Sequence, residues 1–445
     1  MQNINIFKSF RVNGLLGIFN HSIELKQNSS VTIVTAPNGF GKTSLLKAIN
    51  YFYNDIGKLF SFNFISIEIE YDNQDKLTLE KKTVNSDNKL FFVDNQEHVL
   101  EIALFTGGRG RPKRVIIKES SIIKNNNMFK DNRISMNDIE KAFPEYRYIG
   151  AGRFKHMKTD VIRTRNHLIN KIKHMQSVVL PVWLEKLVAK NVKFIETQRL
   201  LHNDNDTTIE VVKKYAEDLS RKIEQKLTIS ASIALSLDRT FPKRLLENET
   251  TDSYSEKELK KKFQELEKKR NNLIDVGILD KDTSPYSLRD EKINDCQISV
   301  LSFYANDIEK KLQVYDEIYT KIKILKDLCN SKFKYKTMHF SKTKGYYFRP
   351  DNSDIDLPLN ELSSGEQHEV VLNYQLLFLT EPNSLVLIDE PELSLHVGWQ
   401  VDYIPDLEKI NNISKFHSLI ATHSPQIING RWSLVEELSE LTNEK

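Results

Sequence analysis

The segment at residues 36–43, APNGFGKT, constrains the fold of this chain more than any other part of it. It follows an apolar, strand-like run, Val31–Thr35, and precedes a segment of helical character at residues 44–53. A strand, a glycine-containing turn and a helix in this order form a phosphate-binding loop, in which backbone N–H groups and the positive end of the helix hold an anion. The sequence therefore predicts an α/β fold with a phosphate site where this strand meets this helix.

The residue types of this loop suggest how it would bind a nucleotide. Its two glycines let the backbone approach an anion closely, the Lys42 ammonium reaches the terminal phosphates, and the Thr43 hydroxyl binds Mg²⁺. The first glycine of the general pattern is Ala36 here, which is small enough for the turn. A glycine turn without a ligand is the alternative, and the Lys-Thr pair argues against it. The residues expected to hold ATP at this loop are Asn38, Gly39, Gly41, Lys42, Thr43 and Ser44.

A second segment, SLVLIDEP at residues 384–391, ends an apolar run with two acids. Such a run is typical of a buried parallel strand that delivers carboxylates at its C-terminal end. Asp389 is expected to hold Mg²⁺ through water, and Glu390 to orient or deprotonate the attacking water. A run of this kind is weak evidence by itself, but it becomes strong in a chain that also carries a phosphate loop.

Two further segments fit the same chemistry. LSSGEQ at residues 362–367 precedes an apolar helix predicted at residues 370–379 and is a second candidate anion site. An ordinary N-cap at Ser363 or Ser364 is the alternative interpretation. ATHSP at residues 421–425 ends a predicted strand at His423, a candidate sensor of the γ-phosphate. A lone histidine is usually structural, but its position after the carboxylate strand favours a functional role.

Taken in this order, the four segments resemble the ATP-binding-cassette (ABC) ATPase family. Gly365 lies 323 residues beyond Lys42, which leaves room for the large insertion of the branch that includes Rad50, RecF and the overcoming-lysogenization-defect (OLD) nucleases. The segments IDEPELSLH at 388–396 and ATHSPQII at 421–428 are similar to the corresponding motifs of OLD-type ATPases of bacterial antiphage defence. PtuA of Septu and AriA of PARIS belong to the same group of proteins. The resemblance implies an ABC-type ATPase head, an α/β domain with a parallel or mixed sheet, carrying a large helical, partly coiled-coil insertion.

The resemblance also implies how two copies would cooperate. Ser363 and Gly365 would contact the γ-phosphate of an ATP held by another chain. Each ATP would then lie between the phosphate loop of one copy and the LSSGE segment of the other. This arrangement implies a homodimer or a larger homo-oligomer, whose association depends on the nucleotide.

Further roles follow only from the resemblance. Gln198, after the strand-like run Val192–Ile195, would occupy the Q-loop position and ligate Mg²⁺ or the attacking water, and Gln176 is the competing assignment. Arg11, in KSFRV, would lie near the adenine or the phosphates. The catalytic set would be Glu390, His423 and Gln198, and the Mg²⁺-binding set would be Thr43, Asp389 and Gln198.

The chain divides into three predicted segments. Residues 1–200 form an N-terminal lobe with the phosphate loop and basic insertions, residues 201–332 are helical, and residues 333–445 form a C-terminal lobe with the LSSGE segment, the carboxylate strand and His423. Within the middle segment, residues 256–274 and 298–328 place apolar side chains at helical spacing. An antiparallel coiled-coil arm and a plain helical subdomain are both compatible with this pattern. The tail is predicted to be an amphipathic helix.

Composition excludes several classes of protein. No apolar run approaches the ~18 residues that a membrane span needs, and Met1 leads into an alternating segment rather than a signal peptide, so a cytoplasmic location is expected. Two cysteines exclude a disulfide scaffold and a multi-cysteine zinc site. The net charge is only +3, but residues 109–118 and 147–174 are strongly basic. These stretches either contact DNA or form a solvated surface.

The resemblance implies an ATPase subunit of a bacterial antiphage defence system that controls a separate toxic effector, a nuclease of the Toprim or HNH type. Only 22 residues follow His423, too few for an effector domain, so the effector is expected to be another chain. No nuclease activity is expected of this chain itself. The alternative is a RecF- or Rad50-like DNA-repair ATPase that binds DNA through the basic stretches.

Overall fold

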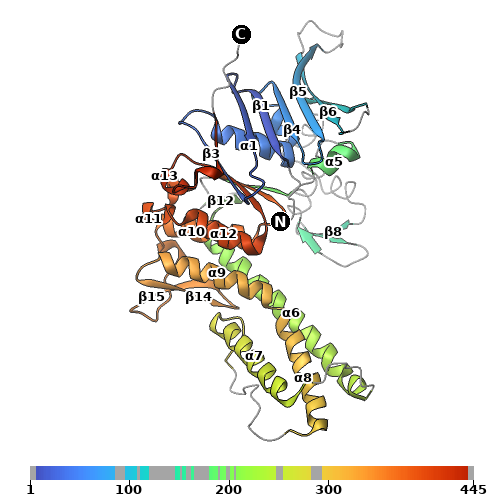
Figure 1. Ribbon diagram of the computed structural model, residues 1–445, viewed down its shortest axis with the longest axis vertical. Helices are drawn as coiled ribbons and strands as arrows, with labels where there is room; N and C mark the ends of the chain where they lie inside the picture. The colour runs from blue at the N-terminus through green and yellow to red at the C-terminus, as the bar shows by residue number, and fades with distance from the viewer. Residues whose placement is uncertain are drawn as a thin grey trace. The chain divides into compact units, whose positions relative to one another are not determined.

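The computed structural model shows two compact units formed by discontinuous parts of the chain (Figure 1). Unit 1 comprises residues 1–196, 381–391 and 416–445, and unit 2 comprises residues 197–380 and 392–415. The residues that the structure describes are 7–85, 96–107, 111–119, 146–150, 153–156, 162–164, 180–188, 191–196, 201–204, 207–246, 254–281 and 293–438. The apolar runs at residues 4–7 and 90–93, which are typical of strands, lie outside the described residues apart from Phe7. The three-segment division of the sequence stays a prediction.

A five-stranded sheet at the centre of unit 1 carries the predicted chemistry. Its strand order is β11-β16-β17-β3-β18, and all four neighbouring pairs are parallel. The side chains of β16 and β17 are buried along their whole length, as expected for a parallel sheet covered on both faces. The strands are β11 (Val192–Ile195), β16 (Leu385–Asp389), β17 (His417–Ala421), β3 (Val31–Thr35) and β18 (Val435–Glu437). The predicted apolar strands at residues 31–35, 192–195 and 384–388 are confirmed to within one residue.

A six-stranded antiparallel sheet, in the order β2-β1-β4-β5-β6-β7, shares one apolar core with the helix α1 (Lys42–Asn54). Helix α1 buries Leu45, Leu46, Ile49 and Phe52 in this core. The strands are β1 (Ser9–Leu15), β2 (Phe19–Glu24), β4 (Ser66–Glu70), β5 (Lys76–Asn85), β6 (Gln96–Phe105) and β7 (Lys113–Lys118). This part of unit 1 also contains four short helices, which are η1 (Ile56–Leu59), α5 (Val182–Val188), α13 (Pro425–Ile428) and η4 (Trp432–Leu434).

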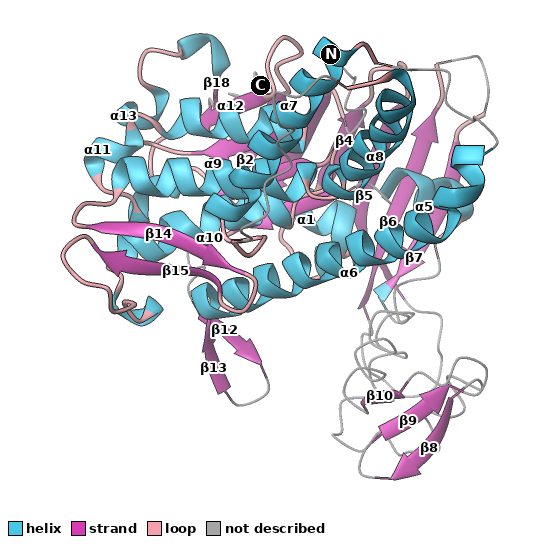
Figure 2. Ribbon diagram, turned by 90° about the horizontal axis from the view of Figure 1, so that it is seen from below, coloured by secondary structure: helices cyan, strands magenta, loops and turns pink. Residues whose placement is uncertain are grey.

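A small third sheet of unit 1 contains part of the second basic stretch. Its order is β10-β9-β8, and both neighbouring pairs are antiparallel. Figure 2 shows these strands as neighbouring arrows. They are β8 (Tyr146–Gly150), β9 (Arg153–His156) and β10 (Ile162–Thr164).

The helices of unit 2 follow the predicted periodicity with one difference. The apolar positions of α7 (Glu256–Asp275), which include Leu259, Phe263 and Leu266, are all buried, as predicted. The single helical segment predicted at residues 298–328 is wrong in one respect, because the chain breaks after Gln313 into α8 (Asp295–Gln313) and α9 (Asp316–Lys332). Helix α8 packs against both α7 and the long helix α6 (Val211–Leu246).

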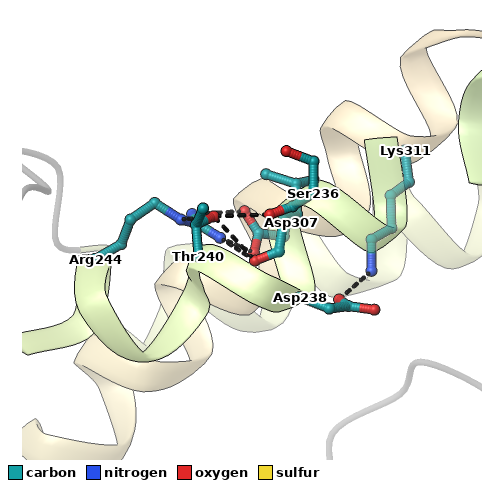
Figure 3. A network of polar contacts seen from close by, with 7 residues as sticks. Ser236, Asp238, Thr240, Arg244, Asp307 and Lys311 are labelled. Atoms are coloured by element: carbon teal, nitrogen blue, oxygen red, sulfur yellow. Dashed lines mark hydrogen bonds and ion pairs between the residues drawn. The ribbon is translucent and has the colours of Figure 1, made fainter. Parts of the chain in front are cut away.

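A partly buried ion pair joins α6 to α8 (Figure 3). The Arg244 guanidinium makes two hydrogen bonds to the Asp307 carboxylate, at 2.9 and 2.7 Å, and donates a third to the Leu237 carbonyl at 3.0 Å. Because Pro242 has no N–H, it cannot make the usual helical hydrogen bond one turn back. Through its two bonds to Asp307, Arg244 fixes this end of α6 on α8.

The rest of unit 2 is a set of short elements around one central helix. That helix is α10 (Ser364–Phe378), which packs against α6, α9 and α12. Two antiparallel hairpins are visible in Figure 2. They are β12 (Leu201–Asp204) with β13 (Thr207–Glu210), and β14 (Lys336–Ser341) with β15 (Gly345–Pro350). The remaining elements are η2 (Leu359–Glu361), η3 (Pro391–Ser394), α11 (Val397–Gln400) and α12 (Tyr403–Ser414).

The helix predicted for the C-terminal tail is wrong where the structure describes it. Val435–Glu437 forms β18, which pairs with β3, and the Leu438 N–H donates to the Thr35 carbonyl at 2.9 Å. The unpaired edge of β3 offers backbone partners that the local helical spacing of the tail does not reveal. Among the described residues, no helix is long and apolar enough to cross a membrane.

Candidate functional site

The phosphate loop, residues 36–43, joins the C-terminal end of β3 to α1, as predicted. Gly39 and Gly41 have φ angles of 86° and 80°, in the left-handed region that favours glycine. Gly41 is the N-cap of α1, so no side chain caps the helix, and its first turn contains no acid. Space around Gly39 is open, because a Cβ placed there would meet nothing within 4 Å. The amide groups at this helix start are thus arranged for an anionic ligand rather than for a side chain of the protein.

Lys42 lies folded against its own loop. Its ammonium donates to the Ala36 carbonyl at 2.7 Å and to the Pro37 carbonyl at 3.2 Å, and the residue is only 5% exposed. The carbonyl oxygens of Ala36 and Pro37 hold the positive charge beside the loop. A phosphate oxygen, which carries a full negative charge, would be a stronger acceptor for the same ammonium.

Thr43 and Asp389 lie together although 346 positions separate them in the sequence. The Thr43 hydroxyl is 3.0 Å from each carboxylate oxygen of Asp389, which is 5% exposed at the end of β16. Strand β17 lies between β16 and β3, and the three strands are parallel. The carboxyl ends of parallel strands meet at one edge of the sheet, which brings the loop after β3 to the acid that ends β16.

Glu390 and His423 form the adjacent part of this edge. Glu390 has a φ of 41°, which is strained for a residue with a side chain, while its N–H still donates to the Ala421 carbonyl at 2.9 Å. Oε1 of Glu390 lies 3.8 Å from Nδ1 of His423, and the two side chains are 24% and 39% exposed. The turn after β16 therefore directs the Glu390 carboxylate toward His423, and both side chains are open to solvent.

A histidine that the sequence analysis did not identify holds the phosphate loop in place. His21, on β2, is buried and donates from Nε2 to the Phe40 carbonyl at 2.7 Å. The Phe19 ring stacks on both His21 and Phe40. Burial lowers the pKa of His21, and the carbonyls of Phe40 and Asn20 offset this only in part. A neutral His21 thus fixes the middle of the phosphate loop.

The remaining residues predicted for this site are placed differently. Ser44 lies in the first turn of α1, and Asn38 is exposed at the tip of the loop. Arg11 lies on β1 with its guanidinium 3.7 Å from the Glu68 carboxylate, and its role near a nucleotide stays a prediction. The neighbouring Phe10 is fully buried in the core. Gln198 and its competitor Gln176 both lie outside the described residues.

The predicted signature, residues 362–367, belongs to unit 2. Ser363 is the N-cap of α10, and Ser363 and Glu366 form a reciprocal capping box. The Ser363 side chain is exposed, and Gly365 lies in the first turn of the helix. The N-cap interpretation of Ser363 is therefore confirmed, and a contact between this helix start and an ATP of another chain stays a prediction.

Comparisons with known proteins define the class of this chain. A family profile described as an AAA ATPase domain (AAA_15) matches residues 8–428, so the chain belongs to this family of ATPases. The narrower likeness to the ATPases of Septu and PARIS stays a prediction.

Among curated proteins, the chain is similar to the probable ATPase of retron Ec83 from Escherichia coli. The two are 30% identical over 148 residues, and the match covers 27% of this chain and only 27% of that protein.

Two solved structures have a loose overall likeness to the chain. The Smc head domain of Pyrococcus furiosus, with an extended coiled coil and bound to the C-terminal domain of ScpA, is 12% identical at a TM-score of 0.35, covering 98% of this chain and 93% of the other. An SmcHead bound to the C-winged helix domain of ScpA is 10% identical at a TM-score of 0.33, covering 95% and 91%. Likeness at this level does not extend to function.

Proposed function

We propose that this chain is the ATP-hydrolysing subunit of a bacterial antiphage defence system, and that ATP held between two copies controls a separate toxic effector. The observation that best supports an ATP site is the contact between the Thr43 hydroxyl and the Asp389 carboxylate. It joins the phosphate loop to the carboxylate strand across the parallel sheet. The match to a retron ATPase supports the place in defence.

The residues at this edge suit Mg²⁺ bound with ATP. Mg²⁺ prefers oxygen ligands and is usually bound by one or two protein groups together with water and phosphate oxygens. The Thr43 hydroxyl and the Asp389 carboxylate are two such groups, and no cluster of three or more His, Cys, Asp or Glu ligands occurs among the described residues. Thr43 and Asp389 would hold the ion, which would neutralise charge on the phosphates.

Glu390 and His423 are placed for the hydrolytic step. A carboxylate beside the phosphate loop can orient or deprotonate a water molecule that attacks the γ-phosphate. His423, 3.8 Å from Glu390, would report the presence of that phosphate. Gln198 would assist the same water or the ion, as the family resemblance implies.

The homodimer is the arrangement that the family resemblance implies for the two anion sites of this chain. The phosphate loop starts α1 in unit 1, and the signature starts α10 in unit 2. In the proposed dimer, Ser363 and Gly365 of one copy contact the γ-phosphate bound by the other. ATP binding then stabilises the dimer by mass action, and hydrolysis weakens it.

The effector is proposed to be a separate nuclease of the Toprim or HNH type. The experiment is to purify this chain alone and to incubate it with plasmid, single-stranded DNA and tRNA in Mg²⁺ and in Mn²⁺. We expect slow ATP hydrolysis and intact nucleic acid. Cleavage that follows the protein through purification and survives Lys42→Ala would contradict the two-component proposal.

A RecF- or Rad50-like function with bound DNA is the second candidate, and the sheet of β8, β9 and β10 favours it. Its twelve residues include four cations and no acid. On the paired strands β8 and β9, Arg147 lies directly opposite Lys155, so these two side chains are on the same face of the sheet. Arg153 precedes Lys155 by two residues and therefore lies on that face as well. All three are exposed, while Phe154 is buried on the opposite face. This face could follow a phosphate backbone.

DNA binding can be tested by its dependence on salt. On duplex DNA, log K falls with log salt by ~0.9 for each phosphate neutralised. Replacing Arg147, Arg153 and Lys155 together with serine should reduce this slope by about 2 to 3 in a fluorescence anisotropy titration. Lys82→Ser, at a lysine paired with Glu80 and Glu101 on another sheet, is the matched control. Absence of binding at low salt would remove this candidate.

A further inference from the structure

Two lysines at the junction of α9 and β14 each contact a glutamate in the first two turns of α10. Nζ of Lys336 lies 2.9 and 3.0 Å from the two carboxylate oxygens of Glu366. Nζ of Lys332 lies 2.5 Å from Oε1 of Glu369 and 2.9 Å from Oδ2 of Asp406 on α12. The start of the signature helix is thus held at two successive turns by one short stretch of chain.

This short stretch is itself fixed. Helix α9 ends at Lys332, and β14 begins at Lys336 after Tyr335, whose φ of 65° turns the chain sharply. The Asn330 side chain accepts a hydrogen bond from the Met338 N–H at 2.8 Å, which ties the end of the helix to the strand. The backbone positions of Lys332 and Lys336 are therefore tied to each other.

Glu366 connects Lys336 to the signature serine. Its Oε2 accepts hydrogen bonds from the Ser363 N–H and from the Ser363 hydroxyl, both at 2.9 Å. Burial alone would raise the pKa of Glu366, but the Lys336 ammonium and the Ser363 donors outweigh it and lower the pKa below its ordinary value. Glu366 is therefore ionised at neutral pH and lies beside the hydroxyl that the proposed function assigns to a γ-phosphate.

An ionised Glu366 carboxylate has two opposing effects at the start of α10. Acids in the first turn stabilise a helix by pairing with its positive end, but they also repel an incoming phosphate. The double contact from Lys336, which is 19% exposed, neutralises Glu366 where the phosphate would dock. Without Lys336, the same carboxylate would face the phosphate with its full charge.

We propose that Lys336 is a positioning residue of the signature. It neutralises Glu366 and holds it on Ser363, so that the start of α10 accepts the γ-phosphate of an ATP bound by another copy. Lys332 anchors the next turn of α10 through Glu369. This proposal rests on the sandwich of ATP between two copies in the proposed function.

Lys336→Met is the test variant, because it removes the charge and keeps much of the side-chain volume. Lys332→Met would leave two buried carboxylates without their cation and would endanger folding. We expect Lys336→Met to lower the ATPase rate by about ten- to a hundredfold, as misplacement of a positioning group does. Binding of ATP to its own phosphate loop should stay within about twofold. The control is Lys260→Met, at an exposed pair with Glu256 on α7, which should keep the parental rate.

A second variant separates charge from structure. Glutamine can replace glutamate in a capping box, so Glu366→Gln keeps the cap of α10 and removes the negative charge. Adding Glu366→Gln to Lys336→Met should therefore recover most of the lost ATPase rate. A double variant that stays as slow as Lys336→Met would overturn the proposed neutralisation of Glu366.

Mixing two inactive variants tests the sandwich independently. Lys42→Ala has a defective phosphate loop and an intact signature, and Lys336→Met has the reverse. Random pairing in a twofold dimer gives half mixed dimers with one intact site each, so an equal mixture should recover about one quarter of the parental rate. A fully active Lys336→Met protein would overturn the role of Lys336 and leave the sandwich standing. If Lys336→Met is slow and the mixture stays inactive, the sandwich itself is wrong, and the proposal falls with it.

Discussion

The helices α1 and α10 both begin at a predicted anion site, but they are built in opposite ways. Helix α1 begins at Gly41, with no side-chain cap and no acid in its first turn. Helix α10 begins at Ser363, with a complete capping box and an acid, Glu366, in its first turn. The first helix start leaves its backbone donors to a ligand, whereas the second satisfies them within the protein.

From this difference we infer different roles for the starts of α1 and α10. In the proposed function, the site at α1, which adjoins Asp389, holds the nucleotide and carries out the chemistry. The site at α10, whose N-cap is satisfied within the protein, would add contacts to a phosphate that another copy already holds. Such a weaker second contact would suit an interface that forms with ATP and dissociates after hydrolysis.

The largest expected effect concerns the chemistry at the α1 site. Glu390→Gln keeps the shape of the side chain and removes the base, so ATP should still bind while hydrolysis slows by about 10²–10⁴-fold. Phosphate release under saturating ATP measures the rate. Hydrolysis at the parental rate would show that Glu390 has no part in the reaction and that the chemistry lies elsewhere.

A buried histidine of unit 1 should make stability sensitive to acid. In unit 1, burial lowers the pKa of His417 to about 4, and its Nε2 lies 3.0 Å from the Thr32 hydroxyl in the parallel sheet. The folded state binds this proton less readily than the unfolded state, whose pKa is near 6.5. Stability is therefore complete above pH 6.5 and is lost as the pH falls toward 4, by about 3 kcal/mol.

At the ion pairs of α10 in unit 2, two side chains have pKa values shifted toward their charged forms. Burial alone would lower the pKa of Lys332, but Glu369 and Asp406 raise it overall, and the pKa of Glu366 is lowered. His417→Gln should flatten the pH dependence of the unfolding free energy between pH 6.5 and 4.5, as measured by denaturant titration. His98→Gln, on β6 outside the parallel sheet, is the control. An unchanged pH profile in His417→Gln would contradict this account of His417.

The smallest expected effect is at the cap of α10. Ser363→Ala removes the hydroxyl that accepts from the Glu366 N–H and should cost about 1 kcal/mol of stability. In the monomer, binding of ATP by the α1 site should not change, because Ser363 would contact only an ATP held by another copy. Thermal unfolding and a nucleotide titration on the same sample measure both quantities. A loss of ATP affinity in the isolated subunit would show that the two helix starts are not independent.

The parts of the site that the sequence predicted are those with a local signal. A strand, a loop with two glycines and a helix occur within 24 residues, and the apolar run before Asp389 marks its own strand. Parallel strand ends meet at one edge, so the contact of Thr43 with Asp389 follows from the two patterns together.

The parts that the sequence missed depend on tertiary contacts. His21 beneath the loop is a single polar residue in a strand, and nothing near it in the sequence points to Phe40. Lys336 reaches Glu366 across 30 positions, in a chain where more than a quarter of the residues are charged. Strand β18 has helical spacing in its sequence, but the open edge of β3 determines its structure. A pattern in the sequence does not show which distant residues become neighbours in the folded chain.

The central claim is that ATP is held by the phosphate loop of α1. Calorimetric titration of MgATP into the parental protein, Lys42→Ala and Ser363→Ala tests it most directly. Lys42 supplies charged hydrogen bonds to phosphate, each worth about 1.5–3 kcal/mol, so Lys42→Ala should bind ATP at least about tenfold more weakly. At protein concentrations at which both proteins are monomers, Ser363→Ala should bind like the parental protein. Parental affinity in Lys42→Ala would contradict the account, because the nucleotide would then be bound at a different place.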